Sequence, residues 1–131
     1  DVQALQKAHI KAFDVQIGGW GSFATVPYLA VTPGLGLQHC HDVLMAQAPY
    51  PDWRYVPHVT LGHYAQQLPV QEVMRQLQGC SVSQSTWQLS VQALWLARYQ
   101  TEDIAGPLFF EGHFDLHTQR YHPAPDALLS L

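Results

Sequence analysis

Pro57-His58-Val59-Thr60-Leu61 is the stretch of this 131-residue sequence that decides the fold. Its alternation of polar and apolar residues predicts a buried β-strand, because successive side chains of a strand point to opposite faces. His58 and Thr60 then lie on one face, roughly 6–7 Å apart. Val59 and Leu61 point to the other face, into the core. An imidazole beside a hydroxyl on one face suits the binding of a small anionic group.

The composition places the chain among folded proteins. Apolar residues make up 47% of the sequence and charged residues 12%, which is typical of a globular protein and not of a disordered one. No apolar run approaches the roughly 20 residues of a membrane span, and no signal-peptide pattern opens the chain. We therefore expect one domain over residues 1–131 that does not enter a membrane, with a loosely packed tail at 122–131.

Charge and cysteine usage narrow the partners and the compartment. The net charge is −4, with six basic residues in the whole chain, which argues against binding long duplex nucleic acid through its phosphates. A small anionic group or one end of an RNA remains compatible with this charge. Cys40 and Cys80 are far apart and form no metal-ligand spacing, so we expect two buried, reduced thiols in a cytoplasmic protein.

Apolar periodicity and turn residues predict the elements. Helices are expected over residues 2–12, 37–48 and 70–77. Strands are expected over residues 13–17, 23–31, 56–64, 87–99 and 110–117, with the glycine-rich residues 18–22 as a loop. Helices that alternate with strand pairs of this kind predict an α+β fold of antiparallel sheets covered by helices.

The residues around Pro57–Leu61 resemble those of a known family. Val56 to Leu61 is similar to the second signature of the two-histidine phosphoesterase superfamily, which contains bacterial 2′-5′ RNA ligases and cyclic nucleotide phosphodiesterases. The preceding order also agrees: a loop with Gly19-Trp20-Gly21-Ser22, a strand at 28–31 and a helix from Leu37 to Leu44. The resemblance covers residues 1–117. It implies two lobes of antiparallel sheet related by a pseudo-twofold axis, with helices on the outer faces.

The sequence departs from the family pattern at its beginning. The family carries one His-x-Thr or His-x-Ser pair on each lobe, and the first pair lies on a strand before the first helix. Here the sequence opens with that helix, and His9-Ile10-Lys11 has lysine where threonine is needed. We therefore expect an N-terminal segment with the first strand and the first pair to be absent from this sequence.

The resemblance implies an activity and a substrate class. His58 would be one acid/base group and Thr60 one donor to the phosphate, with neither a metal nor another cofactor. The substrate would be a small nucleotide or an RNA end that carries a 2′,3′-cyclic phosphate or a 2′-5′ phosphodiester. The alternative is a catalytically degenerate module of the same fold that binds nucleotides or RNA ends, because a single pair leaves either the acid or the base vacant.

Four further residues are candidates for substrate binding. Trp20 and Phe23, in and just after the glycine-rich loop, either stack on a base or fill the core. Arg98 and Tyr99 end the long strand expected at 87–99, where they line a pocket or lie on the surface.

The last predicted strand offers a rival hypothesis, a metal-binding protein. Strict alternation would place Glu111, His113, Asp115 and His117 on one face, and carboxylates with imidazoles are ordinary ligands of divalent ions. The alternative is that this row is the solvated outer face of a sheet. His63 should point away from His58 and is interpreted as structural.

Overall fold

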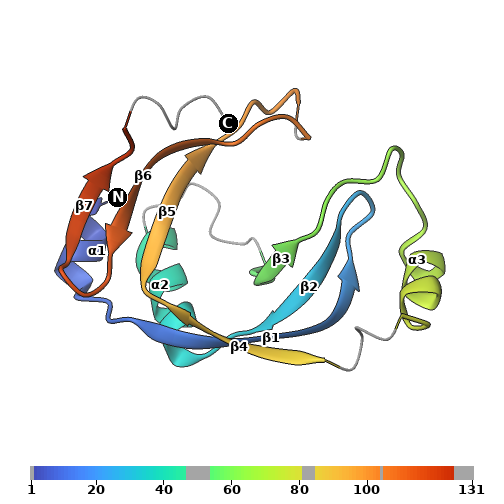
Figure 1. The fold of residues 1–131 in the computed structure, drawn as a ribbon, viewed down its shortest axis with the longest axis horizontal. Coiled ribbons are helices and arrows are strands. Elements are labelled where there is room, and N and C mark those ends of the chain that lie inside the picture. Colours follow the sequence, from blue (N-terminus) through green and yellow to red (C-terminus); the bar gives the residue numbers. More distant parts are fainter. Residues whose placement is uncertain (1, 47–53, 81–84, 104, 126–131) are drawn as a thin grey trace. The chain divides into compact units, whose positions relative to one another are not determined.

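The computed structural model describes residues 2–46, 54–80, 85–103 and 105–125. Within them lie three helices and seven strands, an α+β fold with two sheets, as predicted (Figure 1). In chain order these are α1 (Val2–Ala8), β1 (Phe13–Ser22), β2 (Pro27–Thr32), α2 (Leu35–Met45), β3 (His58–Thr60), α3 (Val70–Leu77), β4 (Thr86–Val91), β5 (Ala93–Arg98), β6 (Phe109–Asp115) and β7 (Arg120–Pro123).

The chain forms two compact units. The first consists of Asp1–Phe13, Leu35–Asp52 and Ser90–Leu131, and the second of Asp14–Gly34 and Trp53–Leu89. The three-stranded sheet, in the order β5-β6-β7, belongs to the first unit. The four-stranded sheet, in the order β3-β2-β1-β4, belongs to the second unit apart from the first residue of β1 and the end of β4.

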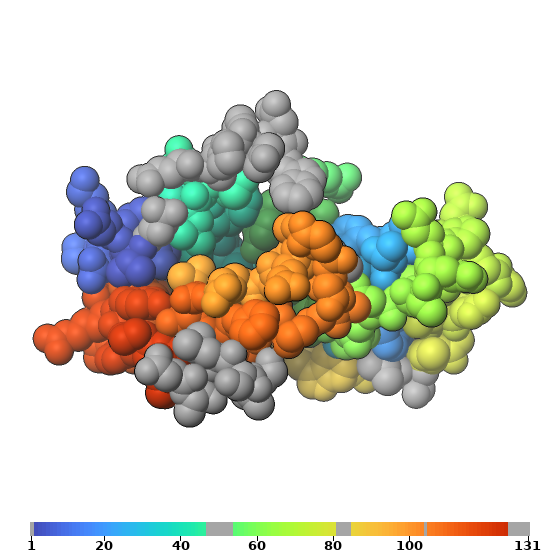
Figure 2. Space-filling view, turned by 90° about the horizontal axis from the view of Figure 1, so that it is seen from above, coloured from blue at the N-terminus to red at the C-terminus, as the bar shows by residue number. Residues whose placement is uncertain are grey.

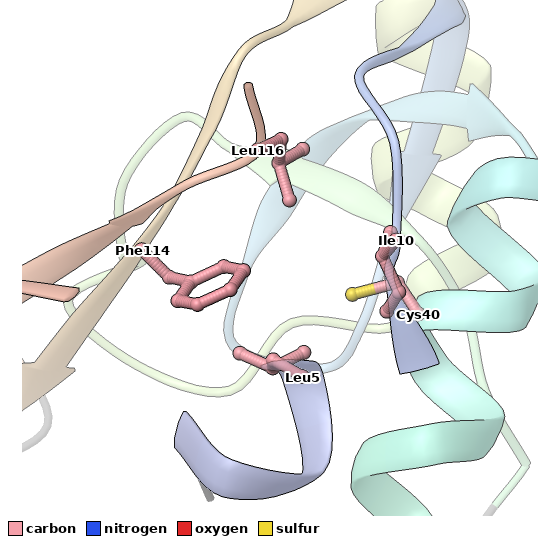
Figure 3. Close-up of a cluster of buried hydrophobic side chains, with 5 residues drawn as sticks. All are labelled: Leu5, Ile10, Cys40, Phe114 and Leu116. Carbon is pink, nitrogen blue, oxygen red and sulfur yellow. The ribbon is translucent and has the colours of Figure 1, made fainter. Parts of the chain in front are cut away.

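The first unit has its core where α1 and α2 cover one face of the three-stranded sheet. Five buried side chains meet there: Leu5, Ile10, Cys40, Phe114 and Leu116 (Figure 3). Phe114 on β6 is the largest, with 2% of its surface exposed. The helices therefore dock on the sheet through one aromatic ring of the central strand.

The central strand β6 contains a bulge that overturns the predicted alternation. Leu96 pairs with Gly112 but its neighbour Ala97 pairs with Phe110, so Glu111 is an extra residue on β6. Past a bulge, side chains no longer keep the faces that strict alternation gives them. As a result Phe110 and His113 both contact the ring of Trp95, with centroid distances of 5.7 and 4.6 Å.

The glycine in this bulge is required by its surroundings. Gly112 has φ of 156°, and an added Cβ would lie 2.4 Å from the carbonyl oxygen of His122. Because that neighbour is backbone, the clash cannot be relieved by a side-chain rotation. We predict that Gly112→Ala lowers the free energy of unfolding by about 1–3 kcal/mol, measured by urea denaturation. Gly79→Ala is the control, since its Cβ would meet nothing closer than 3.5 Å, and equal losses in the two variants would contradict the account.

The predicted loop at 18–22 is wrong, because β1 runs through it. Ile17 pairs with Val31 and Trp20 with Leu29, so the two glycines between them face one residue of β2. Gly19 has φ of 78°, which is the backbone of a glycine bulge. The glycines therefore bend β1 and do not end it.

Two further strand predictions need correction. The single strand expected at 87–99 is two strands, β4 and β5, which are separated at Gln92; its carbonyl accepts a hydrogen bond from the Leu116 amide at 2.9 Å. β3 covers only residues 58–60 and is an edge strand, not a buried one. Because β2 is its one neighbour among the described strands, Val59 and Leu61 keep 38% and 48% of their surface exposed.

Helix α3 agrees with the sequence to the residue. It runs from Val70 to Leu77, and the Pro69 carbonyl accepts hydrogen bonds from the amides of Glu72 and Val73 at 3.1 and 3.2 Å. Val73 is buried.

Several apolar side chains of β5 and of the segment that follows it are exposed: Trp95, Leu96, Tyr99 and Leu108. The segment between β5 and β6 lies at the surface in Figure 2.

The two cysteines differ in exposure. Cys40 is buried, which raises the pKa of its thiol, but Cys80 is exposed, contrary to prediction. His122 and Pro123, which we expected in a loosely packed tail, belong to β7; residues 126–131 lie outside the described part.

The turn between β6 and β7 is held by a carboxylate. The Asp115 carboxylate accepts hydrogen bonds from the backbone amides of Thr118 at 2.7 Å and His117 at 2.8 Å. These bonds hold the pKa of Asp115 below its usual range, and the bond from the Thr118 amide has the largest effect. Such a group stabilises the fold above its unfolded-state pKa, and this contribution is lost as the pH falls through the lowered folded-state value.

We therefore predict that Asp115→Asn destabilises the protein at pH 7 and that the difference from wild type narrows below about pH 4. Urea denaturation at several pH values measures it, with Glu102→Gln as the exposed carboxylate control. A difference that stays constant down to pH 2 would contradict the role given to the charge.

Candidate active site

Backbone pairing with β2 fixes the position of residues 57–61. In the antiparallel ladder between β2 and β3, Tyr28 pairs with Thr60 and Ala30 with His58. The amide of Val31 donates to the Pro57 carbonyl at 3.1 Å, and a matching bond of 3.0 Å runs from Leu61 to Pro27. Since paired residues share a face, His58, Thr60, Tyr28 and Ala30 lie on one side of the sheet, which we call the His58 face.

The His58 ring is oriented by its own backbone. Its Nδ1 lies 2.6 Å from the carbonyl oxygen of Val56. A carbonyl only accepts, so Nδ1 must carry the proton and donate it. In the neutral ring Nε2 is then the unprotonated nitrogen, able to take a proton, and in the charged ring it can give one. The imidazole is exposed, so Nε2 is accessible to a ligand.

Two aromatic rings flank the imidazole. The ring centroids of Phe23 and Tyr28 both lie 5.2 Å from that of His58, and 4.7 Å from each other. The Tyr28 ring lies across Gly21, where an added Cβ would be 2.1 Å from it. Sequence reasoning missed Tyr28, because its place beside Thr60 depends on the strand register; an aromatic residue in the neighbouring predicted strand was the available signal.

Hydrogen bonds hold the segment that carries Phe23. The Phe23 amide donates to the Val26 carbonyl at 2.9 Å, and the Tyr64 amide donates to the Thr25 carbonyl at 2.9 Å. The hydroxyl groups of Ser22 and Tyr64 lie 3.0 Å apart. The turn that presents Phe23 is thus tied to the segment that follows β3, and the exposed ring stays next to His58.

Small residues leave space beside the imidazole. Ala30 is the partner of His58 across the ladder, and Gly18 and Gly19 lie opposite Ala30 on the next strand. Gly62, two residues after Thr60, has φ of 155°, and no heavy atom lies within 4 Å of a Cβ built there. An imidazole nitrogen and a hydroxyl on one face, with small residues beside them, can accommodate a phosphate group.

The other predicted binding residues lie elsewhere. Trp20 pairs with Leu29, so it points to the face opposite His58, and its buried Nε1 has no hydrogen-bond partner among the described residues. Arg98 belongs to the first unit, where it pairs with Glu111 and lies 5.4 Å from the centroid of the Phe109 ring. Tyr99 follows it and is half exposed.

The geometry of β6 does not support the rival hypothesis of a metal site on this strand. Glu111 pairs with Arg98, Asp115 binds the amides of its own turn, and His113 stacks against His122 with 5.0 Å between ring centroids. His117 contacts the side-chain oxygen of Gln92. The bulge and these separate partners keep the four groups from converging, and the described residues contain no group of three or more His, Cys, Asp or Glu that could hold a metal ion.

Comparison with known proteins identifies the family. The model of the 2′-5′ RNA ligase superfamily matches residues 1–103. The chain belongs to the 2′-5′ RNA ligase superfamily. The matched region contains His58, Thr60 and the two aromatic rings beside them. Neither the curated proteins nor the solved structures contain a match. Among the described residues, no helix of this superfamily member is long and apolar enough to cross a membrane.

The orientation of His58 has a direct spectroscopic consequence. We predict that the neutral imidazole is the Nδ1-protonated tautomer, because the Val56 carbonyl accepts that proton. The ¹⁵N chemical shifts of the ring nitrogens, recorded at alkaline pH so that the ring is neutral, report the tautomer; His58→Ala assigns the signals. An Nε2-protonated ring would contradict the geometry.

Proposed function

We propose that the protein is a metal-independent phosphoesterase that acts on 2′,3′-cyclic phosphates or on 2′-5′ phosphodiesters at RNA ends. The hydrogen bond from His58 Nδ1 to the Val56 carbonyl carries this proposal, because it presents Nε2 on the same face as the Thr60 hydroxyl. Membership of the 2′-5′ RNA ligase superfamily supports the substrate class.

The chemistry follows from these two groups. A water molecule attacks phosphorus in line with one ribose oxygen; a new P–O bond forms, and the bond to that ribose oxygen breaks. His58 Nε2 either removes the proton of the water or delivers a proton to the leaving oxygen. The Thr60 hydroxyl donates a hydrogen bond to a nonbridging oxygen, where negative charge accumulates.

The first test removes the imidazole. We predict that His58→Ala lowers kcat on 2′,3′-cyclic nucleotides by about 10²–10⁴-fold, the usual effect of losing one acid/base group. His63→Ala is the matched control, because His63 is exposed and lies five residues away in the chain. Turnover is followed by chromatography of the ring-opened nucleotide with EDTA present. An undiminished rate for His58→Ala, or a rate abolished by EDTA, would sink the proposal.

One observation favours a second function, a binding module. The sequence contains a single His-x-Thr pair, His58 and Thr60, and in-line displacement uses both an acid and a base. If the second group is not supplied, the site binds a cyclic or terminal phosphate without turning it over. Calorimetric binding of a 2′,3′-cyclic nucleotide that is weakened by Thr60→Val, with no product formed by the wild type, would favour this function.

A further inference from the structure

The strand β5 leaves one edge of the three-stranded sheet open. Among the described strands, β5 has a single partner, β6. Its residues Ala93–Ala97 are all apolar, and Arg98, which ends the strand, pairs with Glu111. Trp95 and Leu96 are each 55% exposed. An open edge strand that is apolar along its length is a template for pairing with another strand.

The other edges of the two sheets are protected in ways that β5 is not. The edge strand β3 has only three residues. The edge strand β7 has four, which include a charged residue, Arg120, and a proline, Pro123. In β4, polar residues alternate with apolar ones. Short length, charge and proline are the usual means by which edge strands avoid association. The contrast indicates that β5 is suited to pairing.

The backbone of β5 presents the polar groups of alternate residues to the open edge. The Gln92 carbonyl accepts a hydrogen bond from the Leu116 amide, on the β6 side, at 2.9 Å. Because residues that bond to the neighbouring strand alternate with residues that do not, Trp95 directs its N–H and C=O groups away from β6. The same holds for Ala93 and Ala97. The extra residue of the bulge is on β6, so the alternation continues along β5.

The sequence of β5 reads the same in both directions about Trp95, as Ala93-Leu94-Trp95-Leu96-Ala97. When two such strands pair antiparallel with Trp95 at a twofold axis, Trp95 opposes its own copy, leucine opposes leucine and alanine opposes alanine. The outward N–H and C=O groups of the two Trp95 residues can then bond each other in both directions. A twofold contact of this kind uses the same patch on both subunits. No charged residue opposes another in it.

Both faces of β5 offer apolar surface to a second copy. Leu94 pairs with Phe114 of the core, so Leu94 and Leu96 belong to the face covered by α1 and α2. An apolar cavity of about 330 Å³ on this face is lined by both leucines and by Leu44 of α2. In the twofold arrangement the leucines of the copy lie next to this cavity. The two Trp95 rings meet on the other face.

We propose that two copies of this chain associate through β5, in antiparallel register with the Trp95 residues opposite each other at the twofold axis. The two three-stranded sheets then form one continuous sheet. The association uses backbone hydrogen bonds and apolar burial, and it requires no ligand. It goes beyond the phosphoesterase function and does not depend on it.

The place of Trp95 at the axis allows a charge-exchange experiment. Sedimentation velocity of the 131-residue chain over a range of concentrations should show a monomer–dimer equilibrium. We expect Trp95→Lys and Trp95→Glu each to raise the dimer dissociation constant by about tenfold or more, because like charges then lie directly opposite each other. An equimolar mixture of the two variants should recover the dimer, since lysine then opposes glutamate. Trp87→Lys, at the exposed tryptophan of β4, is the control and should dimerise like the wild type.

Hydrogen exchange shows whether β5 is the contact. The Trp95 amide should exchange more slowly as the wild-type concentration rises, and this measurement decides the inference if circular dichroism shows that a charged variant is unfolded. A wild-type chain that stays monomeric overturns the inference, and a Trp95 amide protected in that monomer assigns the edge to another segment of the same chain. A dimer that both folded charged variants leave intact, or a mixture of them that associates no better than either alone, also overturns it.

Discussion

The antiparallel pairing of β3 with β2 is the interaction on which the site depends. Three residue pairs place His58 opposite Ala30 and Thr60 opposite Tyr28. A slip of one residue would turn both groups to the other face of the sheet. Because β3 is short and lies at an edge, hydrogen bonds outside the strand, such as that from Tyr64 to Thr25, help to keep this register. The same register places the Tyr28 ring on the face of His58.

A glycine-containing bulge interrupts one strand in each of the two sheets. In the second unit the bulge at Gly18 and Gly19 bends β1 next to Ala30, the residue that pairs with His58. These two glycines have no side chains that could fill the space beside Ala30. In the first unit the bulge at Gly112 redirects β6, so Phe110 joins His113 against Trp95 while Phe114 remains in the core. Bulges are frequent beside active sites because they re-aim side chains without ending a strand.

Local patterns in the sequence predicted the elements with strong periodicity and the family. Helix α3, the α+β class and the His58 to Thr60 strand follow from spacing, proline and glycine alone. The bulges were not predictable, because glycine pairs signal turns as strongly as they signal bulges. The exposure of Val59 and the partnership of Tyr28 with Thr60 depend on strand order, which is a property of distant segments. The alternation expected on β6 failed because it assumes a regular strand, and the bulge at Glu111 interrupts it.

The account places a phosphate between His58 Nε2 and the Thr60 hydroxyl, and a crystal structure with a bound nucleoside 3′-phosphate tests this most directly. It predicts nonbridging oxygens of that phosphate within hydrogen-bond distance, about 2.6–3.2 Å, of both side-chain atoms, while Nδ1 remains bonded to the Val56 carbonyl. A phosphate bound away from the His58 face, or an imidazole turned so that Nδ1 meets the phosphate, would contradict it.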